Sequence, residues 1–367
     1  MTDFRLEPLS DKTWNSEIEE KLTCVAAFHE THDTKTFVFE SPSRARITFD
    51  PGQFLTFGFE IGGEVVNRCY TLASSPTRPG TASITVKRVP GGAVSEWLHT
   101  VFSPGMEVSA QGPMGHFTAA KHPASKYLFL SGGSGITPMM SMTRAFVDRN
   151  APVDILFVHA ARTPLDLVFR SELSLMARRS QGLRLFFLPE RRDGEPEWPG
   201  AVGRISTELL RAVVQDIRQR IVFCCGPAPF MAAARAICAE LGAPPTAYHE
   251  ESFDFSTLQG QDRSLGEEAR AAEASEATRA ESFAIQFTKS NRNATGPASQ
   301  TVLTIARDNG IPIPSSCRNG VCGTCKSRLI SGSVDMKHQG GIRQREIAAG
   351  MFLPCCSKPL TDLTIER

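Results

Sequence analysis

The chain has 367 residues, with 40 lysines and arginines against 39 aspartates and glutamates. A chain of this length is usually divided into two or three domains. Its balanced charge argues against nucleic acid or an anionic membrane surface as the main partner.

Residues 1–20 form a polar, acidic extension that does not resemble a signal peptide. No apolar run in the sequence reaches the length of a membrane-spanning helix. We therefore expect a soluble, cytoplasmic protein. In that reducing compartment, ten cysteines indicate metal binding rather than disulfides.

Residues 21–124 are predicted to form a small antiparallel β-barrel. The segments "KTFVFES", "GQFLTFGFEI", "CYTLASSP" and "ASITVKRV" alternate apolar and polar residues between turns, as short strands of a barrel do. Within "NRCYTLASSP", Arg68, Tyr70 and Thr71 bring together a guanidinium, an aromatic face and a hydroxyl. These groups suit a planar ligand that carries phosphate, although an ordinary strand explains the letters too.

Residues 125–253 are predicted to form a parallel α/β domain, because strands such as "YLFLSGG" and "VDILFVHAAR" alternate with helical segments. In "LSGGSGITP", Gly132, Gly133 and Gly135 let the phosphates of a dinucleotide approach the backbone at the start of a helix. Thr137 is the predicted N-cap and Pro138 the first helical residue. The spacing is not that of the usual Rossmann fingerprint.

Residues 254–280 are rich in Ala, Glu, Ser and Gly and are interpreted as a linker. Its root-mean-square span of roughly 30 Å would let the C-terminal domain move as a tethered shuttle. The alternative is a C-terminal domain packed in one fixed position, with the linker on the surface. Residues 281–367 are predicted to form a small α+β domain. They carry eleven basic and six acidic residues, which suggests a partner with an acidic docking patch.

Cys317, Cys322 and Cys325 have the C-x4-C-x2-C spacing of a plant-type 2Fe-2S cluster, and "LPCCS" supplies a fourth thiolate. Gly320 and Gly323 suit a loop that winds tightly around a cluster. A structural zinc site and unligated buried thiols are the alternatives. Residues 281–367 resemble plant-type ferredoxins, with a β-grasp-like fold, and the resemblance places the fourth ligand at Cys355.

The upstream segments, in their order, resemble the ferredoxin-NADP reductase superfamily. In "VKRVPGGAVSEWLH" a glycine-led turn opens a short helix that would face a pyrophosphate; a hairpin turn with a serine cap is the alternative. The resemblance implies flavin-binding roles for Arg68, Tyr70, Thr71, Val86, Lys87, Gly92, Ala93, Val94 and Ser95. It implies nicotinamide-nucleotide roles for Gly132, Gly133, Gly135, Ile136, Thr137, Pro138, Arg162, Gly226, Pro227 and Met231.

Three further residues receive roles at the reacting atoms from the same resemblance. In "FCCGPAPFM" Cys225 would lie beside the nicotinamide, and in "HEESF" Glu251 would organise the hydride site while Phe253 covers the flavin. Burial in the core is the competing interpretation for Cys225, and an acidic turn followed by a packing phenylalanine is the competing one for "HEESF". The cysteines at 24, 69, 224 and 238 are interpreted as structural.

The cofactors implied are FAD, a 2Fe-2S cluster and NADH. FAD is favoured over FMN by the "GGAVS" turn, whereas NADPH stays an alternative because Arg162 in "HAARTP" is able to accept a 2′-phosphate. NAD(P)H gives an electron pair and a 2Fe-2S cluster takes one electron at a time, so a flavin must stand between them.

The domain order and the segments "PGQF", "FCCGPAPFM" and "HEESF" also resemble reductase components of Rieske-type oxygenases that demethylate quaternary ammonium compounds such as glycine betaine or stachydrine. This resemblance implies a Rieske-type terminal oxygenase as the partner. An NADH reductase of a hybrid-cluster protein is the alternative enzyme. An iron-sulfur redox sensor or binding module is the alternative from another class.

Overall fold

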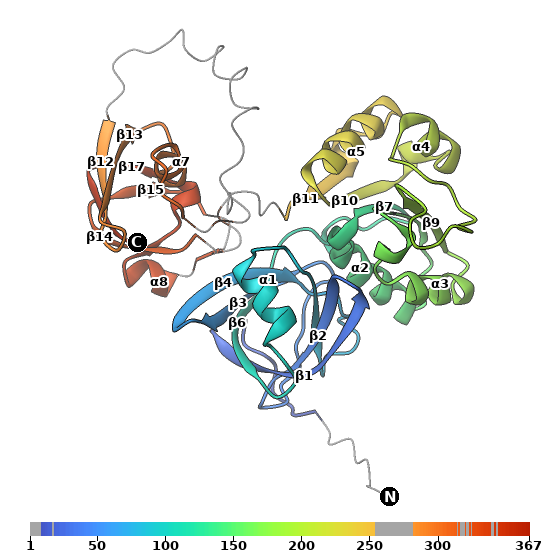
Figure 1. Ribbon diagram of the computed structural model, residues 1–367, viewed down its shortest axis with the longest axis horizontal. Coiled ribbons are helices and arrows are strands. Elements are labelled where there is room, and N and C mark those ends of the chain that lie inside the picture. Colours follow the sequence, from blue (N-terminus) through green and yellow to red (C-terminus); the bar gives the residue numbers. More distant parts are fainter. Residues whose placement is uncertain are drawn as a thin grey trace, which may run out of the picture. The chain divides into compact units, whose positions relative to one another are not determined.

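The computed structural model describes residues 9–16, 18–253, 282–313, 315, 320, 323, 325–338, 341–342 and 344–367. The chain divides into two compact units, Met1–Phe253 and Asp254–Arg367 (Figure 1). The predicted linker over 254–280 lies outside the described residues. Among the residues that are described, no helix is both long and apolar enough to cross a membrane.

The first unit begins with an antiparallel sheet of six strands in the order β4-β3-β6-β1-β2-β5. An isolated bridge between Leu72 and Ile84 joins the two edges of this sheet, so it closes as a barrel. Phenylalanines at alternating positions of β2 and β3 fill its core. The elements are β1 (Glu20–Thr31), β2 (Thr34–Glu40), β3 (Phe54–Ile61), β4 (Glu64–Thr71), β5 (Ala82–Lys87), α1 (Ala93–Thr100) and β6 (Glu107–Met114).

One predicted strand has different bounds in the structure. The segment "CYTLASSP" contains only the end of β4, which stops at Thr71. The serines that follow bond to neighbouring segments instead: Ser83 N donates to Ser74 Oγ at 3.0 Å, and Ser141 Oγ donates to Ser74 O at 2.7 Å. The second of these bonds connects the barrel to helix α2 (Thr137–Asp148).

The same unit continues with a parallel sheet in the order β11-β10-β7-β8-β9. The strands are β7 (Lys126–Gly132), β8 (Asp154–Ala161), β9 (Leu183–Pro189), β10 (Ile221–Cys225) and β11 (Tyr248–Glu251). The helices are α2 (Thr137–Asp148), α3 (Arg170–Arg179), α4 (Thr207–Val213) and α5 (Ala228–Glu240).

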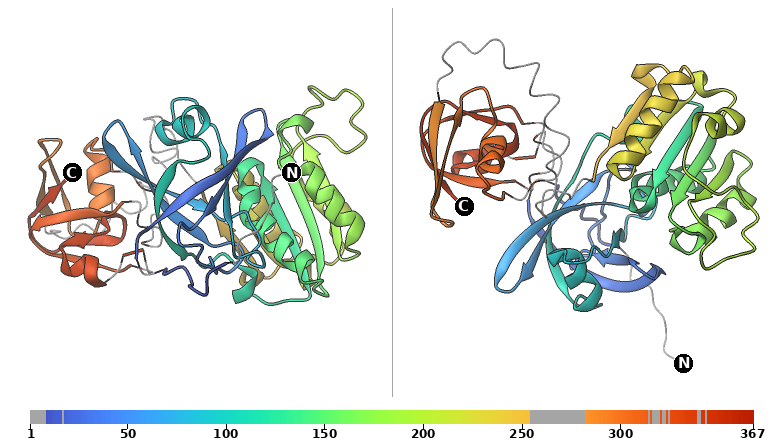
Figure 2. Two further views of the ribbon diagram at one scale, coloured as in Figure 1. Left: turned by 90° about the horizontal axis from the view of Figure 1, so that it is seen from below. Right: turned by 45° about the horizontal axis from the view of Figure 1, so that its top comes forward.

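Helices lie on both faces of the parallel sheet (Figure 2), and alternate residues of β7 belong to two different cores. Tyr127 and Phe129 belong to a core shared with α2, α3 and the barrel residue Phe117. Leu128 and Leu130 belong to a second core with α4 and α5. Helices therefore cover both faces of the sheet, as expected for parallel strands that are buried on both sides.

The second unit contains a mixed five-stranded sheet in the order β13-β12-β18-β14-β16, with β15 and β17 paired separately. Its core is formed by side chains such as Ile285, Phe287 and Ile365, which are fully buried. The elements are β12 (Ser282–Phe287), β13 (Arg292–Pro297), α7 (Val302–Asp308), β14 (Ser327–Ser331), β15 (Val334–Met336), α8 (Gln344–Ala348), β16 (Met351–Phe352), β17 (Ser357–Pro359) and β18 (Leu363–Glu366).

Candidate functional site

The glycine-rich turn after β7 forms a short 3-10 helix, η2 (Gly133–Ile136), before α2 begins. Gly133 has a φ of +54°, a left-handed conformation that glycine adopts readily. The predicted N-cap at Thr137 is wrong. Ile136 is the N-cap and is already helical, because η2 runs directly into α2. Thr137 is the first residue of α2 and donates to Ser134 O at 3.4 Å, and Pro138 is the second.

This turn lies against the turn that follows β10. A Cβ atom on Gly135 would be 2.4 Å from Cys225 O and 2.6 Å from Gly226 N. In the opposite direction, a Cβ atom on Gly226 would be 3.0 Å from Gly132 N. The structure therefore brings the "GGSG" and "CGP" segments together as a single backbone surface, with Pro227 as the N-cap of α5.

Cys225 and Glu251 occupy matching positions at the ends of neighbouring strands. Cys225, on β10, is paired with Ser131 of β7 and with Glu251 of β11. Burial raises the pKa of the Cys225 thiol well above its usual value, with smaller contributions from Glu251 and Cys224. The thiol is therefore neutral at physiological pH. Phe253 packs against the core cluster that contains Cys225.

Met231 lies apart from these residues. It is 5% exposed and packs in the core between α5 and the parallel sheet, together with Ile237. Ile136 and Pro138 are likewise buried. The side chains of Met231, Ile136 and Pro138 therefore pack beneath the two turns and support their positions.

On the barrel, Arg68 and Tyr70 occupy alternate positions of β4, with Thr71 at its end. The ring of Tyr70 packs against Phe57 and Phe59, with centroid distances of 6.2 and 6.1 Å. Burial raises the pKa of the Tyr70 phenol and lowers the pKa of Arg68. Arg68 Nη1 donates to Asn67 O at 2.8 Å, and Thr71 is 6% exposed.

The turn between β5 and α1 is held by one serine. Gly92 is the N-cap of α1 and makes no side-chain cap. Ser95 Oγ accepts from Val89 N at 3.1 Å and donates to Gly92 O at 3.2 Å, so this hydroxyl stabilises the turn. Ala93 and Val94 begin the helix, and Val94 is 3% exposed.

A cavity of about 170 Å³ opens beside the glycine-rich turn. Both parts of the first unit contribute to it, since Thr34 and Lys87 come from the barrel. The remaining lining residues are Gly132, Gly133, Ser134, Ala160, Ala161, Arg162, Asp166, Val168, Glu190, Pro227 and Phe230. The cavity therefore joins the predicted phosphate turn to Arg162.

Two carboxylates hold Arg162 at this cavity. Arg162 Nη2 donates to Asp33 Oδ2 and to Asp166 Oδ1, each at 2.9 Å. Lys87 lies 3.3 Å from Asp33 Oδ2. Burial lowers the pKa of Arg162, but the bonds and charges of Asp166 and Asp33 outweigh burial and raise it overall. Lys87, a predicted flavin-binding residue, thus faces the nucleotide-side cavity.

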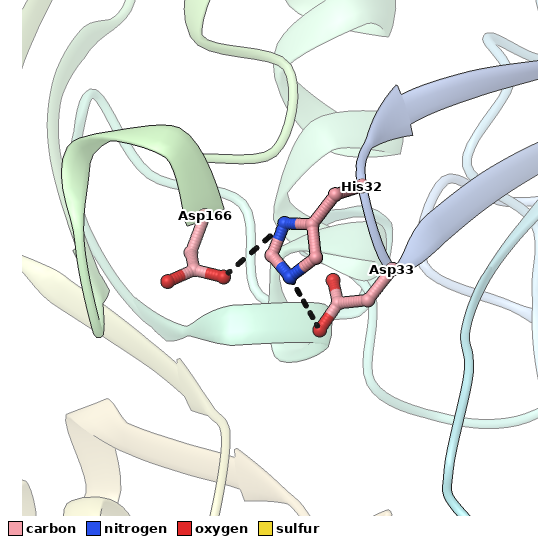
Figure 3. Close-up of side chains that lie close together, drawn as sticks. All are labelled: His32, Asp33 and Asp166. Carbon is pink, nitrogen blue, oxygen red and sulfur yellow. Dashed lines mark ion pairs between the residues drawn. The ribbon is translucent and has the colours of Figure 1, made fainter. Parts of the chain in front are cut away.

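Asp33 and Asp166 were not predicted as site residues. Asp166 carries a sequence signal, because "TPLD" has the spacing of a capping box, and the structure contains that box. Asp33 lies in a turn that has no comparable signal. His32 lies between the two carboxylates (Figure 3), with ring nitrogens 3.8 Å from Asp33 Oδ2 and 3.9 Å from Asp166 Oδ1. Arg162 and Lys87 already neutralise the two carboxylates, which disfavours a metal ion there.

A buried histidine lies beside the end of β7, where the glycine-rich turn begins. His159 on β8 is fully buried, and its Nδ1 lies 2.7 Å from Ser131 Oγ. Burial lowers the pKa of His159 to about 4, against a smaller opposing contribution from Ser131. The imidazole is therefore neutral at physiological pH.

In the second unit, Cys325 and Cys355 lie in one apolar core and are 2% and 6% exposed. Cys355 is part of the 3-10 turn η7 (Pro354–Cys356). Cys317 and Cys322 lie outside the described residues. Gly320, with a φ of +76°, lies so close to Cys356 that an added Cβ would be 2.7 Å from Cys356 Sγ. The 320 position thus accepts glycine alone, in keeping with a tight cluster loop.

A cation lies close to the Cys325 segment. Arg367 Nη2 donates to Lys326 O at 3.4 Å, and Arg367 Nε donates to Ser327 Oγ at 3.3 Å. Ser327 Oγ in turn donates to Cys325 O at 3.0 Å. Burial lowers the pKa of Arg367, while Cys325 raises it. Lys326 is paired with Glu346.

Three family models match the chain. They are described as Oxidoreductase FAD-binding domain, over residues 21–119, Oxidoreductase NAD-binding domain, over 129–236, and 2Fe-2S iron-sulfur cluster binding domain, over 286–360. These matches confirm the predicted superfamily resemblance and the three predicted kinds of fold.

Two known proteins are similar along nearly their whole length. The chain is 41% identical over 368 residues to the glycine betaine monooxygenase reductase subunit of Pseudomonas aeruginosa, covering 100% of both chains. It is 39% identical to a stachydrine N-demethylase reductase subunit of Rhizobium meliloti, covering 95% of this chain and 96% of that one.

Among solved structures, phthalate dioxygenase reductase matches with a TM-score of 0.57 and 23% identity, covering 96% of this chain and 98% of that chain. At this identity the likeness shows the fold alone. The same combination of barrel, parallel sheet and iron-sulfur domain is therefore known in a solved structure.

Proposed function

The chain belongs to the family of reductase subunits that combine FAD-binding, NAD-binding and 2Fe-2S domains, and we propose that its electrons go to a Rieske-type oxygenase. The proposed oxygenase demethylates a quaternary ammonium compound such as glycine betaine or stachydrine. The observation that carries this proposal is the full-length identity with reductase subunits named for those two substrates. The prediction of an oxidoreductase is confirmed by the family itself.

When bound, the reduced nicotinamide supplies a hydride, the flavin accepts it and releases electrons singly, and the 2Fe-2S cluster carries one electron at a time. Our assignment of residues begins at the paired turns. The backbone of Gly132, Gly133 and Gly135 would hold the nucleotide phosphates, because no side chain screens its N–H groups. Cys225 would offer a neutral thiol beside the nicotinamide, with Glu251 and Phe253 next to it.

On the barrel, the residues present fit a flavin with phosphates. Arg68 would bind phosphate oxygens, while Tyr70 and Thr71 would lie along the ring system. Val86 and the helix start at Gly92 would follow the pyrophosphate, which supports FAD over FMN as the flavin. Lys87, which the resemblance also assigns to the flavin, lines the nucleotide-side cavity and pairs with Asp33 instead. Ser95 would act indirectly, since its hydroxyl holds the turn in place.

In the second unit, we assign the cluster to Cys317, Cys322, Cys325 and Cys355. This assignment is supported by the buried thiols of Cys325 and Cys355 and by the requirement for glycine at position 320. Four thiolates must stay reduced to bind iron, so we place the reaction in the cytoplasm.

The proposed electron donor is NADH. Arg162 is the residue that a 2′-phosphate of NADPH would use, and its guanidinium is bonded to Asp33 and Asp166. A ribose diol needs no cation, because its hydroxyls donate hydrogen bonds to carboxylates.

Reconstitution tests the proposal. The full chain, loaded with flavin and cluster, is mixed with a purified Rieske-type oxygenase of the glycine betaine or stachydrine type, NADH and the substrate. We expect NADH oxidation that depends on the quaternary ammonium compound, with one formaldehyde released per N-methyl group removed.

The control reaction replaces the oxygenase by ferricyanide. Fast ferricyanide reduction together with no substrate-dependent oxidation of NADH, for either oxygenase, would show a working reductase with a different partner and would reject the proposal.

A further inference from the structure

The turn between β1 and β2 presents one fixed carboxylate to the parallel domain. Thr31 Oγ1 and Thr34 Oγ1 donate to Asp33 Oδ1 at 3.0 and 3.1 Å. The other oxygen, Oδ2, accepts from Arg162 at 2.9 Å and lies 3.3 Å from Lys87. The Asp33 side chain is only 18% exposed. One oxygen of Asp33 therefore accepts hydrogen bonds within the turn, and the other accepts a hydrogen bond from Arg162 of the neighbouring domain.

Arg162 is held from its own domain as well. Asp166 is 7% exposed, and its Oδ2 accepts from Thr163 N at 3.0 Å and from Thr163 Oγ1 at 2.8 Å. Its Oδ1 accepts from Arg162. The capping box therefore fixes the second carboxylate, and the guanidinium lies between two anions that are themselves anchored.

These charges lie at the candidate nucleotide cavity. Arg162, Lys87 and Asp166 line it together with the glycines of the phosphate turn, and Glu190 adds a further carboxylate. A 2′-phosphate entering beside Arg162 would meet a cation that is already neutralised and carboxylates that repel it. A ribose hydroxyl would meet acceptors for its hydrogen bonds.

We propose that Asp33, a residue of the flavin barrel, sets the preference of the nicotinamide domain for NADH over NADPH by holding Arg162 and Lys87 away from a 2′-phosphate. This inference rests on the proposed use of NADH. It adds that the discriminating carboxylate comes from the neighbouring domain and acts through Arg162 and Lys87.

The test compares NADH and NADPH as donors to ferricyanide, for the full chain with flavin bound. In Asp33→Asn the ratio of kcat/KM for NADPH to that for NADH is expected to rise about tenfold or more, because Lys87 loses its anionic partner and Arg162 loses one of its two. In the Arg162→Ala/Lys87→Ala background, Asp33→Asn is expected to change the ratio less than about threefold. A gain that persists without Arg162 and Lys87, or a ratio that Asp33→Asn leaves unchanged, would overturn the proposal.

Asp148→Asn is a matched control. Asp148 at the end of α2 is also 18% exposed and also bonds across the two parts of the unit, to Arg78 at 2.7 Å and Thr77 at 2.5 Å. It is not among the residues that line the cavity. Its substitution is expected to leave the NADPH to NADH ratio unchanged.

A measurement on the unmodified chain covers the case in which Asp33→Asn does not fold or loses its flavin. Inhibition of NADH oxidation is compared for 5′-AMP and 2′,5′-ADP. We expect 5′-AMP to inhibit at lower concentration, and stronger inhibition by 2′,5′-ADP would overturn the proposal. Both assays use ferricyanide as the acceptor, so a wrong assignment of the oxygenase partner would not affect either result.

Discussion

Gly135 and Cys225 lie in backbone contact although they belong to different turns, and a Cβ atom on Gly135 would be 2.4 Å from the carbonyl oxygen of Cys225. The carbonyl belongs to β10 and cannot move aside without shifting the sheet. The two segments that resemble nucleotide-binding motifs therefore depend on each other for their positions.

The substitution Gly135→Ala is expected to separate these turns. Overpacking against backbone costs about 1–3 kcal/mol or more, and we expect the rate of flavin reduction by NADH to fall at least tenfold, while dithionite still reduces the flavin. Stopped-flow absorbance measures both reactions. As a control, the methyl group of Gly62→Ala meets no atom within 4 Å, although the φ of +62° at this position strains an added side chain; the substitution is expected to lower stability and to leave the NADH rate unchanged. An unchanged rate of flavin reduction by NADH in Gly135→Ala would contradict the inference that the two turns form one backbone surface.

Cys224 and Cys225 are adjacent and equally buried, but their side chains belong to different cores. Replacing either by alanine is expected to cost about 1–2 kcal/mol of unfolding free energy. Only Cys225→Ala is expected to slow flavin reduction by NADH, by about tenfold, because only this thiol lies on the face shared with the barrel. Equal rates in the two variants would place Cys225 in the core without a role in hydride transfer.

The hydrophobic periodicity and the turn residues of the sequence predicted the three domains, because each strand or helix is marked by a local residue pattern of its own. The parallel strand around Phe129 is a continuous apolar run, and the glycines after it mark a turn. Asp33 illustrates what sequence could not provide, since its role depends on Arg162, which lies 129 positions away. Thr137 was predicted as a cap because it follows the glycine-rich turn and precedes Pro138. The 3-10 turn η2, in which Gly135 lies against Cys225, runs directly into α2 and moves the N-cap to Ile136.

The two cysteines at the end of "LPCC" differ in burial: Cys355 is buried, whereas Cys356 is partly exposed and donates to Leu353 O at 3.6 Å. We expect Cys355→Ser to lose the cluster and Cys356→Ser to keep it. Iron and acid-labile sulfide content, with the EPR signal after reduction, distinguish the two. Loss of iron in Cys356→Ser with retention in Cys355→Ser would reverse the assignment of the fourth ligand.

His159 makes the stability of the parallel domain depend on pH. Its pKa is lowered from 6.5 to about 4, so between these values the unfolded chain binds a proton that the folded domain does not. Stability is therefore full above pH 6.5 and falls as the pH decreases toward 4, by up to roughly 3 kcal/mol. Hydrogen exchange of peptides from β7 and β8 measures this loss.

In His159→Asn the same loss between pH 6.5 and 4 is expected to be much smaller, although the variant is less stable at every pH. His116→Asn is the control, because His116 is exposed and its variant should keep the slope of the unmodified chain. An unchanged slope in His159→Asn would assign the acid sensitivity to other groups.

The two layers of helices on the parallel sheet differ in what they contact. The layer of α2 and α3 shares its core with the barrel through Phe117. A change in side-chain volume in that core therefore alters the packing of both the barrel and the parallel domain. The layer of α4 and α5 packs on the sheet in a separate core. An engineer who wants a more heat-resistant enzyme should begin with α4 in that outer layer, because α5 is capped by Pro227 and carries Phe230, and both of these residues line the candidate nucleotide cavity.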